Sequence, residues 1–284
     1  MKLIFMDFEK IFTIDNLDIF DSLKDKFVNS ECNKLWLQYE EFWKKGLISN
    51  SECLTNQFNL LQLDNNSLKS YISRLKVNDR GFKNFFKLVK QNNKEYKFFI
   101  ISENVDFIIR HIMKKVFDEK EFAILQSNCN LTEANIIGFL NQNWKNNEKD
   151  NNKENNEKIL VFSNILNFIV YKKIKCHKNN KEIPLNCQKV FYPYKKLSLK
   201  KGDTKNTICK KCIKDIIVNY ISRVKKAKDI KTIFIGANYT EGDIELAKSC
   251  DKVVTFSNNT LTSQLEMNNN DYTSISNFSD LITL

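Results

Sequence analysis

Short runs of apolar residues alternate with longer amphipathic stretches along most of the chain. The apolar runs are typical of β-strands, and they cover residues 2–7, 97–102, 159–163, 231–236 and 251–256. Apolar residues between several of these runs recur at spacings of three and four, which predicts amphipathic helices. Strands that alternate with helices favour a parallel sheet with helices on both faces, so we predict an α/β fold.

One long stretch contains helical patterns without a strand between them. Residues 15–76 carry four such patterns in succession, and we predict a helical cap inserted after the first strand. The core domain would then comprise residues 1–14 and 77–284. Residues 141–158 are almost free of apolar side chains and predict an exposed low-complexity insertion within that core.

Composition limits the class of protein. The chain has 284 residues, 42% of them hydrophobic and 22 of them Phe, which is enough for one large domain or a core with a subdomain. The six Gly and two Pro argue against a loop-rich all-β fold. No apolar run approaches the roughly 18 residues of a membrane span, and the first residues are too short and too acidic for a signal peptide. We therefore predict a soluble, cytoplasmic protein, in which the eight Cys are reduced thiols or metal ligands.

Positive charge is concentrated in one part of the chain. Residues 172–231 contain 19 Lys and Arg against four Asp and Glu, an excess of +15, whereas the whole chain carries +11. The other residues together therefore carry −4. Such asymmetry favours a polyanionic partner, although a solvated lysine-rich surface would give the same count.

Three of the predicted strands end at residues that could belong to a ligand site. Asp7 follows the first strand, Ser102 ends the strand at 97–102, and Gly236 ends the strand at 231–236. The carboxyl ends of parallel strands meet at one edge of a sheet, where ligands bind. An aspartate at such an edge can attack phosphorus and form an aspartyl phosphate, and hydroxyl and ammonium groups can hold the phosphate oxygens.

The order of these residues resembles the haloacid dehalogenase (HAD) superfamily, closest to its phosphoserine-phosphatase-like branch. The resemblance rests on motif I at Asp7-Phe8-Glu9-Lys10-Ile11, motif II at Ser102, a motif III lysine and motif IV at Gly236–Glu241. It implies a HAD-like (Rossmannoid) parallel sheet core, with Asp7 as nucleophile and Glu9 as general acid. It also implies that Ser102 and the motif III lysine hold the phosphate and that Mg²⁺ is the cofactor. Lys205, in "KGDTKNT", is the first candidate for that lysine and Lys214 the second.

Several positions depart from the family pattern. Glu9 lengthens the arm of the expected general acid by one methylene, and Ile11 stands where the family has Thr. Ala237 stands where the family has a metal-binding carboxylate, which should weaken Mg²⁺ binding strongly because the ion relies on few protein carboxylates. In motif IV, Glu241 keeps a negative charge where the family has an aspartate that does not bind the metal directly. Asp243 is nearby, but we expect its place in the helix to direct it elsewhere.

Cysteines near the basic segment predict a possible zinc site. Cys209 and Cys212 form a CxxC unit, and Cys176 and Cys187 precede it at loop-like spacings. Zn²⁺ takes four thiolate or imidazole ligands, so these four could bind a structural zinc, with His177 as a substitute for its neighbour. Relatives in this branch also carry cysteines near motif III without zinc, so a metal-free interpretation stays open.

Lysines and aromatic residues interleave in "KVFYPYKKLSLKKGD". This arrangement suits base stacking combined with phosphate contacts to RNA, although a strand and turn with solvated lysines has the same composition. The residues that we predict to bind RNA are Lys189, Tyr192, Tyr194, Lys195, Lys196, Lys200, Lys201, Lys210 and Lys211.

Two functions fit the sequence. The first is a catalytically impaired HAD-fold factor that binds the ribosome or its RNA through a basic face, with no membrane or DNA partner. A resemblance to the microsporidian dormancy factors related to fungal HAD phosphatases implies this dormancy or hibernation role. The alternative is a working Mg²⁺-dependent HAD phosphatase that acts on a small phosphorylated metabolite.

Overall fold

We describe the chain from a computed structural model. It describes residues 1–13, 17–48, 50–61, 65–92, 95–127, 133–144, 158–164, 167–169, 189–191, 210–227, 229–237, 240–256, 260–267, 271–276 and 278–283. These residues divide between two compact units. The first unit contains residues 1–17, 76–164 and 208–284, and the second contains residues 18–75 and 165–207.

The first unit is built around a seven-stranded sheet in which all neighbouring strands are parallel. The strand order is β3-β4-β2-β1-β7-β8-β9, so β1 lies in the centre. The bounds are β1 Lys2–Met6, β2 Tyr96–Val105, β3 Phe122–Ser127, β4 Ile159–Asn164, β7 Lys231–Gly236, β8 Lys252–Phe256 and β9 Thr273–Ile275. The predicted α/β class and parallel sheet are confirmed. The runs at 97–102, 159–163, 231–236 and 251–256 correspond to β2, β4, β7 and β8.

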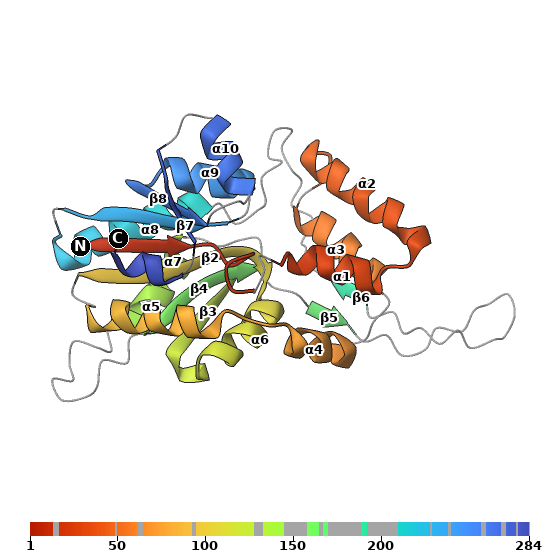
Figure 1. The fold of residues 1–284 in the computed structure, drawn as a ribbon, viewed down its shortest axis with the longest axis horizontal. Helices are drawn as coiled ribbons and strands as arrows, with labels where there is room; N and C mark the ends of the chain where they lie inside the picture. The colour runs from red at the N-terminus through yellow and green to blue at the C-terminus, as the bar shows by residue number, and fades with distance from the viewer. Residues whose placement is uncertain are drawn as a thin grey trace, which may run out of the picture. The chain divides into compact units, whose positions relative to one another are not determined.

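Helices cover both faces of this sheet (Figure 1). Their bounds are α5 Asp79–Gln91, α6 Asp106–Val116, α7 Glu133–Trp144, α8 Lys210–Lys225, α9 Glu241–Lys248 and α10 Thr260–Met267, with short 3-10 turns η3 Glu119–Glu121 and η5 Phe278–Thr283. We predicted a low-complexity insertion from residue 141, but α7 continues to Trp144. The rest of that predicted insertion lies almost entirely outside the described residues.

Alternation along the strands sends side chains to two separate cores. Leu3, Phe5 and Phe99 belong to a buried cluster that also contains residues of α7, α8, α9 and α10. On the other face, Phe82 of α5 contacts Phe98 of β2 and Phe278 of η5, at ring-centroid distances of 5.7 and 5.4 Å. Because both faces are apolar, the strands are nearly continuous hydrophobic runs, as expected for a buried parallel sheet.

The second unit is mainly helical. It contains α1 Ile19–Phe27, η2 Ser30–Cys32, α2 Asn33–Lys44, α3 Asn50–Leu60 and α4 Asn65–Arg74. Buried Trp36 of α2 donates to the Glu40 carboxylate, which also accepts from Gln57 of α3, at 3.2 and 3.3 Å. These helices lie within the stretch that we predicted as a cap.

A small hairpin also belongs to the second unit. Strands β5 (Asn167–Ile169) and β6 (Lys189–Phe191) pair antiparallel with each other, and β6 contacts α3. Of the basic segment 172–215, which we placed in the core, the structure describes only residues 189–191 and 210–215; the first range belongs to the second unit and the second range to the first unit. The hairpin strands pair only with each other among the described strands, so they do not extend the parallel sheet.

Within the described residues, no helix combines the length and the hydropathy that a membrane span needs.

Candidate active site

The site begins at the carboxyl end of the central strand β1. The side chain of Asp7 is buried, and its backbone N–H donates to the Ile235 carbonyl of β7 at 2.9 Å. The turn that follows is fixed by packing, because the Phe8 and Phe12 rings stack at 4.7 Å and Phe12 lies 4.3 Å from the Phe82 ring. Ile11 is also buried, so the apolar residue that departs from motif I is part of the core.

A lysine that we assigned to RNA binding lies at the centre of this site. The Nζ of Lys210, the first residue of α8, donates to Asp7 Oδ1 at 3.0 Å and to Asp243 Oδ1 at 2.5 Å. The side chains of Asp7, Lys210 and Asp243 are at most 2% exposed. The assignment of Lys210 to an RNA-binding surface is therefore wrong, because its ammonium is enclosed between two carboxylates. We call these three residues the charge triad.

Asp243 is held by the start of helix α9. Thr240 is the N-cap, and its hydroxyl accepts from the Asp243 N–H at 3.1 Å and donates to Asp243 Oδ2 at 2.7 Å. The Thr240 side chain thus caps α9 and also binds the Asp243 carboxylate. Our expectation that Asp243 points elsewhere is wrong, because its Oδ1 accepts from Lys210 Nζ. The pattern Thr240-Glu-Gly-Asp243 could have identified it in the sequence.

The charges of the triad do not balance. Two carboxylates and one ammonium sum to −1 in a region that water barely reaches. Burial and the neighbouring Asp243 raise the pKa of Asp7 from 3.8 to about 6, although Lys210 opposes the rise. An isolated excess charge is costly in such surroundings, so the site favours uptake of a proton or another cation.

Ser102 lies at the same edge of the sheet, on the strand next to β1. It is fully buried, and its hydroxyl accepts from the N–H of buried Asn104 at 3.0 Å, within an irregularity of β2 between Ile101 and Val105. On the neighbouring strand β4, Phe162 pairs with Ile101, and the next residue, Ser163, is also buried. Three polar side chains thus stand at the carboxyl ends of β2 and β4.

The chain carries no polar side chain at residues 236 and 237, where β7 ends. Gly236 is followed by Ala237, which is fully buried. A Cβ at Gly236 would lie 2.7 Å from the Phe234 ring and 2.8 Å from Leu261, so packing leaves no room for a larger residue. The structure does not describe the side chain of Glu241, and Glu9 is half-buried in the turn after Asp7.

The described residues do not fit a resident Mg²⁺ ion of the kind that the fold implies. Mg²⁺ requires oxygen ligands in octahedral geometry and usually takes one or two carboxylates. Here Asp7 and Asp243 both bind an ammonium, and Ala237 provides no oxygen from its side chain. Among the residues that the structure describes, no group of three or more His, Cys, Asp and Glu could hold a metal ion.

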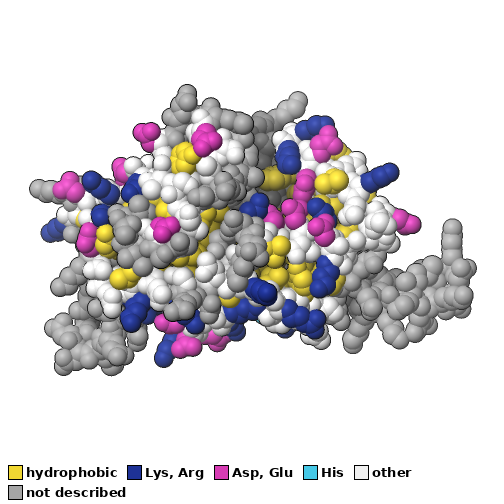
Figure 2. All heavy atoms as spheres, viewed as in Figure 1, with side chains coloured by type: hydrophobic (Ala, Val, Ile, Leu, Met, Phe, Trp, Pro, Cys, Tyr) yellow, Lys and Arg dark blue, Asp and Glu magenta, His cyan; other side chains and the backbone are white. Residues whose placement is uncertain are grey.

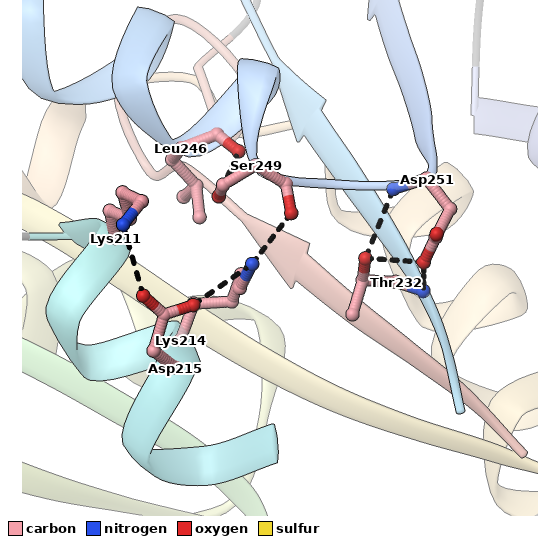
Figure 3. Close-up of polar contacts among 7 residues, drawn as sticks. All are labelled: Lys211, Lys214, Asp215, Thr232, Leu246, Ser249 and Asp251. Carbon is pink, nitrogen blue, oxygen red and sulfur yellow. Dashed lines mark hydrogen bonds and ion pairs between the residues drawn. The ribbon is translucent and has the colours of Figure 1, made fainter. Parts of the chain in front are cut away.

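Lys214 has a different role from the one that we considered. Figure 3 shows its ammonium bonded to the Ser249 carbonyl, at 2.6 Å, and to Asp215. This carbonyl follows the end of α9, whereas Asp243 lies in its first turn. Lys211 is half-exposed and pairs with Asp215 at 3.2 Å. Among the described residues, Lys210 rather than Lys214 is therefore the lysine whose ammonium binds Asp7.

The other predicted site residues are largely outside the described part of the chain. Of the candidate zinc ligands, only Cys212 is described, and it is disulfide-bonded, which leaves no thiolate there for a metal. The residues that fall outside are Lys205, Cys176, His177, Cys187, Cys209, Tyr192, Tyr194, Lys195, Lys196, Lys200 and Lys201. Lys189 is described only in its backbone, as the first residue of β6.

Comparison with known proteins identifies the fold. No family model matches the chain, and no curated protein sequence matches it. A substrate-bound phosphoserine phosphatase has a similar structure, with a TM-score of 0.50 and 13% identity over 99% of this chain and 97% of that chain. A phosphoserine phosphohydrolase-like protein from Francisella tularensis subsp. tularensis gives 0.45 and 14% over 100% and 99%. The chain therefore has the HAD-like fold of the phosphoserine phosphatases.

Proposed function

We propose that this chain hydrolyses a small phosphate monoester, with Asp7 as the nucleophile. The observation that carries the proposal is the position of Asp7, a buried carboxylate at the carboxyl end of the central strand, bonded to a buried ammonium. The fold is shared with a phosphoserine phosphatase, whose substrate is a phosphate monoester, and this supports the assignment. A carboxylate in this position can form an acyl phosphate, which splits one difficult hydrolysis into two easier steps.

The chemistry can be written with this chain's own residues. A carboxylate oxygen of Asp7 forms a bond to phosphorus, and the bond from phosphorus to the ester oxygen breaks. The leaving oxygen keeps the electron pair and takes a proton from the Glu9 carboxyl. Water then attacks the acyl phosphate and gives a proton back to Glu9, which releases phosphate and restores the Asp7 carboxylate. Lys210 stabilises negative charge beside Asp7 throughout.

Two features predict slow turnover. The additional methylene of Glu9 moves the proton donor, and a misplacement of about 1 Å can cost about 10²-fold in rate. The charge triad is net negative, so it repels a phosphate dianion. Both features lower the rate while leaving the nucleophile in place.

The test is hydrolysis of p-nitrophenyl phosphate by the wild type and by Asp7→Asn. We expect slow turnover by the wild type and a fall to the rate without enzyme in the variant, because an amide cannot form the acyl phosphate. Asp25→Asn is the matched control, since its carboxylate is 74% exposed and it should retain wild-type turnover. Turnover that survives Asp7→Asn, or a wild type with none, would contradict the proposal.

A second candidate function is binding to ribosomal RNA, which the basic segment 172–231 favours through its excess of +15. The structure reduces the charge available there, because Lys210 and Lys214 are buried and Lys211 pairs with Asp215. On the face shown in Figure 2, basic and acidic side chains of the described residues are interspersed. This candidate therefore rests on the other basic residues of the segment, among which Arg223, Lys226 and Lys231 are described and exposed.

Binding to ribosomes is expected to weaken by orders of magnitude between about 50 and 200 mM salt if six or more phosphates are contacted. Changing Lys195, Lys196, Lys200 and Lys201 to Glu should then abolish co-sedimentation with ribosomes at low salt. The control changes four exposed lysines, Lys34, Lys44, Lys83 and Lys120, to Glu, which alters the net charge equally. Equal loss in both sets would show that bulk charge, rather than a local surface, causes the association.

A further inference from the structure

A cavity of about 110 Å³ lies between the central strands of the sheet and α5. It is partly open, and apolar side chains make up most of its lining, among them Ile4 of β1, Ile233 of β7, Val89 of α5 and Leu281 of η5. Tyr96, the first residue of β2, also lines it. The cavity therefore reaches the amino-terminal edge of the sheet, where β1 begins at the end marked N in Figure 1, whereas the charge triad lies at the carboxyl-terminal edge.

Three lysines occupy this edge, at the first residues of neighbouring strands. Lys2 of β1 pairs with Lys231 of β7, and Lys252 of β8 pairs with Ile233 of β7. Side chains alternate along a strand, and paired residues of neighbouring strands point to the same face. All three lysines therefore lie on the face of the sheet that carries Ile4 and Ile233. We call Lys2, Lys231 and Lys252 the lysine row.

The lysine row gives the polar end of the cavity a positive charge. The Nζ of Lys2 donates at 2.9 Å to the hydroxyl of Tyr96, which lines the cavity. Among the described carboxylates, only Glu95 pairs with a lysine of the row, at 3.6 Å from Lys2. The Glu95 side chain is 58% exposed, and such surface pairs are weak, so a second carboxylate could replace it.

The size and lining of the cavity suit one apolar ring. An apolar cavity of about 150 Å³ in another protein stays dry and binds benzene, and the cavity here is somewhat smaller. We propose that this edge of the sheet holds a second binding site, which takes a small carboxylate with a single apolar ring. The ring lies between the sheet and α5, and its carboxylate binds the ammonium groups of Lys2 and Lys231. The site shares no residue with the charge triad, so it does not depend on the proposed function.

Calorimetric titration of the wild-type chain with benzoate at low ionic strength tests the site. We expect saturable binding with a Kd on the order of 1 mM or below, as for a ligand of this size. Benzyl alcohol has the same ring without the charge and should bind at least about fivefold more weakly, because it gains no charge-assisted contact. Absence of saturable benzoate binding at millimolar concentrations, or equal affinity for the two compounds, would overturn the inference.

Two lysine substitutions separate a local contact from bulk charge. Lys2→Met should weaken benzoate binding about fivefold and leave benzyl alcohol unchanged, whereas Lys2→Arg keeps the charge and should retain benzoate affinity. Lys97→Met is the matched control, because Lys97 follows Tyr96 in β2 and pairs with Leu3, which places it on the opposite face of the sheet at the same edge. It should bind benzoate like the wild type. Equal losses in Lys2→Met and Lys97→Met would overturn the inference.

Filling the cavity tests where the ring binds. Val89→Phe places a ring of the protein's own in this space and should abolish binding of both compounds. Val89 is buried, so circular dichroism must first show that the variant folds. Undiminished benzoate binding by the folded variant would place the ligand elsewhere and contradict the assignment. If the variant does not fold, the comparison of Lys2→Met with Lys97→Met decides the question.

Discussion

Replacing Lys210 with Met is expected to lower the free energy of unfolding by about 3–5 kcal/mol near pH 7.5. The substitution keeps most of the side-chain volume but leaves Asp7 and Asp243 buried without their shared cation. Two desolvated carboxylates would then repel each other with no compensating charge. Urea denaturation followed by circular dichroism measures the change.

The next lysine along the helix provides a matched control. Lys211→Met removes the same charge from the same turn of α8, but its side chain is 49% exposed and pairs with Asp215 at the surface. Its effect should stay within about 1 kcal/mol, as for other surface ion pairs. Adding Asp243→Asn to Lys210→Met should recover part of the lost stability, because one uncompensated charge is removed. Equal effects of Lys210→Met and Lys211→Met would show that the triad contributes no more than a surface ion pair.

The strands around the centre of the sheet could be predicted from the sequence because burial on both faces makes them continuous apolar runs. Strand β3 lies at one edge of the sheet and was missed. It contains the residues FAILQS, so its apolar run is short. Edge strands bury less surface, and their sequences carry a weaker signal.

Asp7 and Ser102 could be located because each directly follows or ends an apolar run, and the sheet fixes where such ends meet. The lysine could not be located in this way. Lys205 matched a short motif, whereas Lys210 begins α8, and only the packing of α8 against the sheet brings its ammonium to Asp7. Local sequence similarity does not report such contacts between distant segments, here separated by 203 positions.

The hairpin β5–β6 shows a similar limit. Its strands are three residues each and are separated in the sequence by about twenty positions. Segments of three residues are too short to show a hydrophobic periodicity, so neither strand could be predicted, nor the unit to which they belong. The basic segment could therefore be recognised by its charge, but not placed.

Stability should depend on pH through Asp7. Its pKa is raised to about 6 in the folded chain, from 3.8, chiefly because the carboxylate is buried. Between these two values the folded state binds more protons than the unfolded state, so the contribution of Asp7 to stability falls as the pH rises from about 4 to about 6. Above pH 6, Asp7 is ionised in both states, and its burial lowers the free energy of unfolding by about 3 kcal/mol, the value that corresponds to a pKa shift of about 2.

Asp7→Asn should therefore stabilise the protein at pH 8 by about 2–3 kcal/mol while it abolishes hydrolysis, because the amide carries no charge and its oxygen can still accept from Lys210. At pH 4 the gain should nearly vanish, since Asp7 of the wild type is then protonated as well. Thermal melts of both proteins across this range give the difference, in which the titration of carboxylates remote from Asp7 cancels. Asp25→Asn, at a carboxylate that is 74% exposed, is the control for replacing a carboxylate with an amide. A destabilised Asp7→Asn at pH 8 would mean that the ion pair with Lys210 outweighs the cost of burying Asp7. The nucleophile would then be held in place by a favourable interaction rather than kept at the expense of stability.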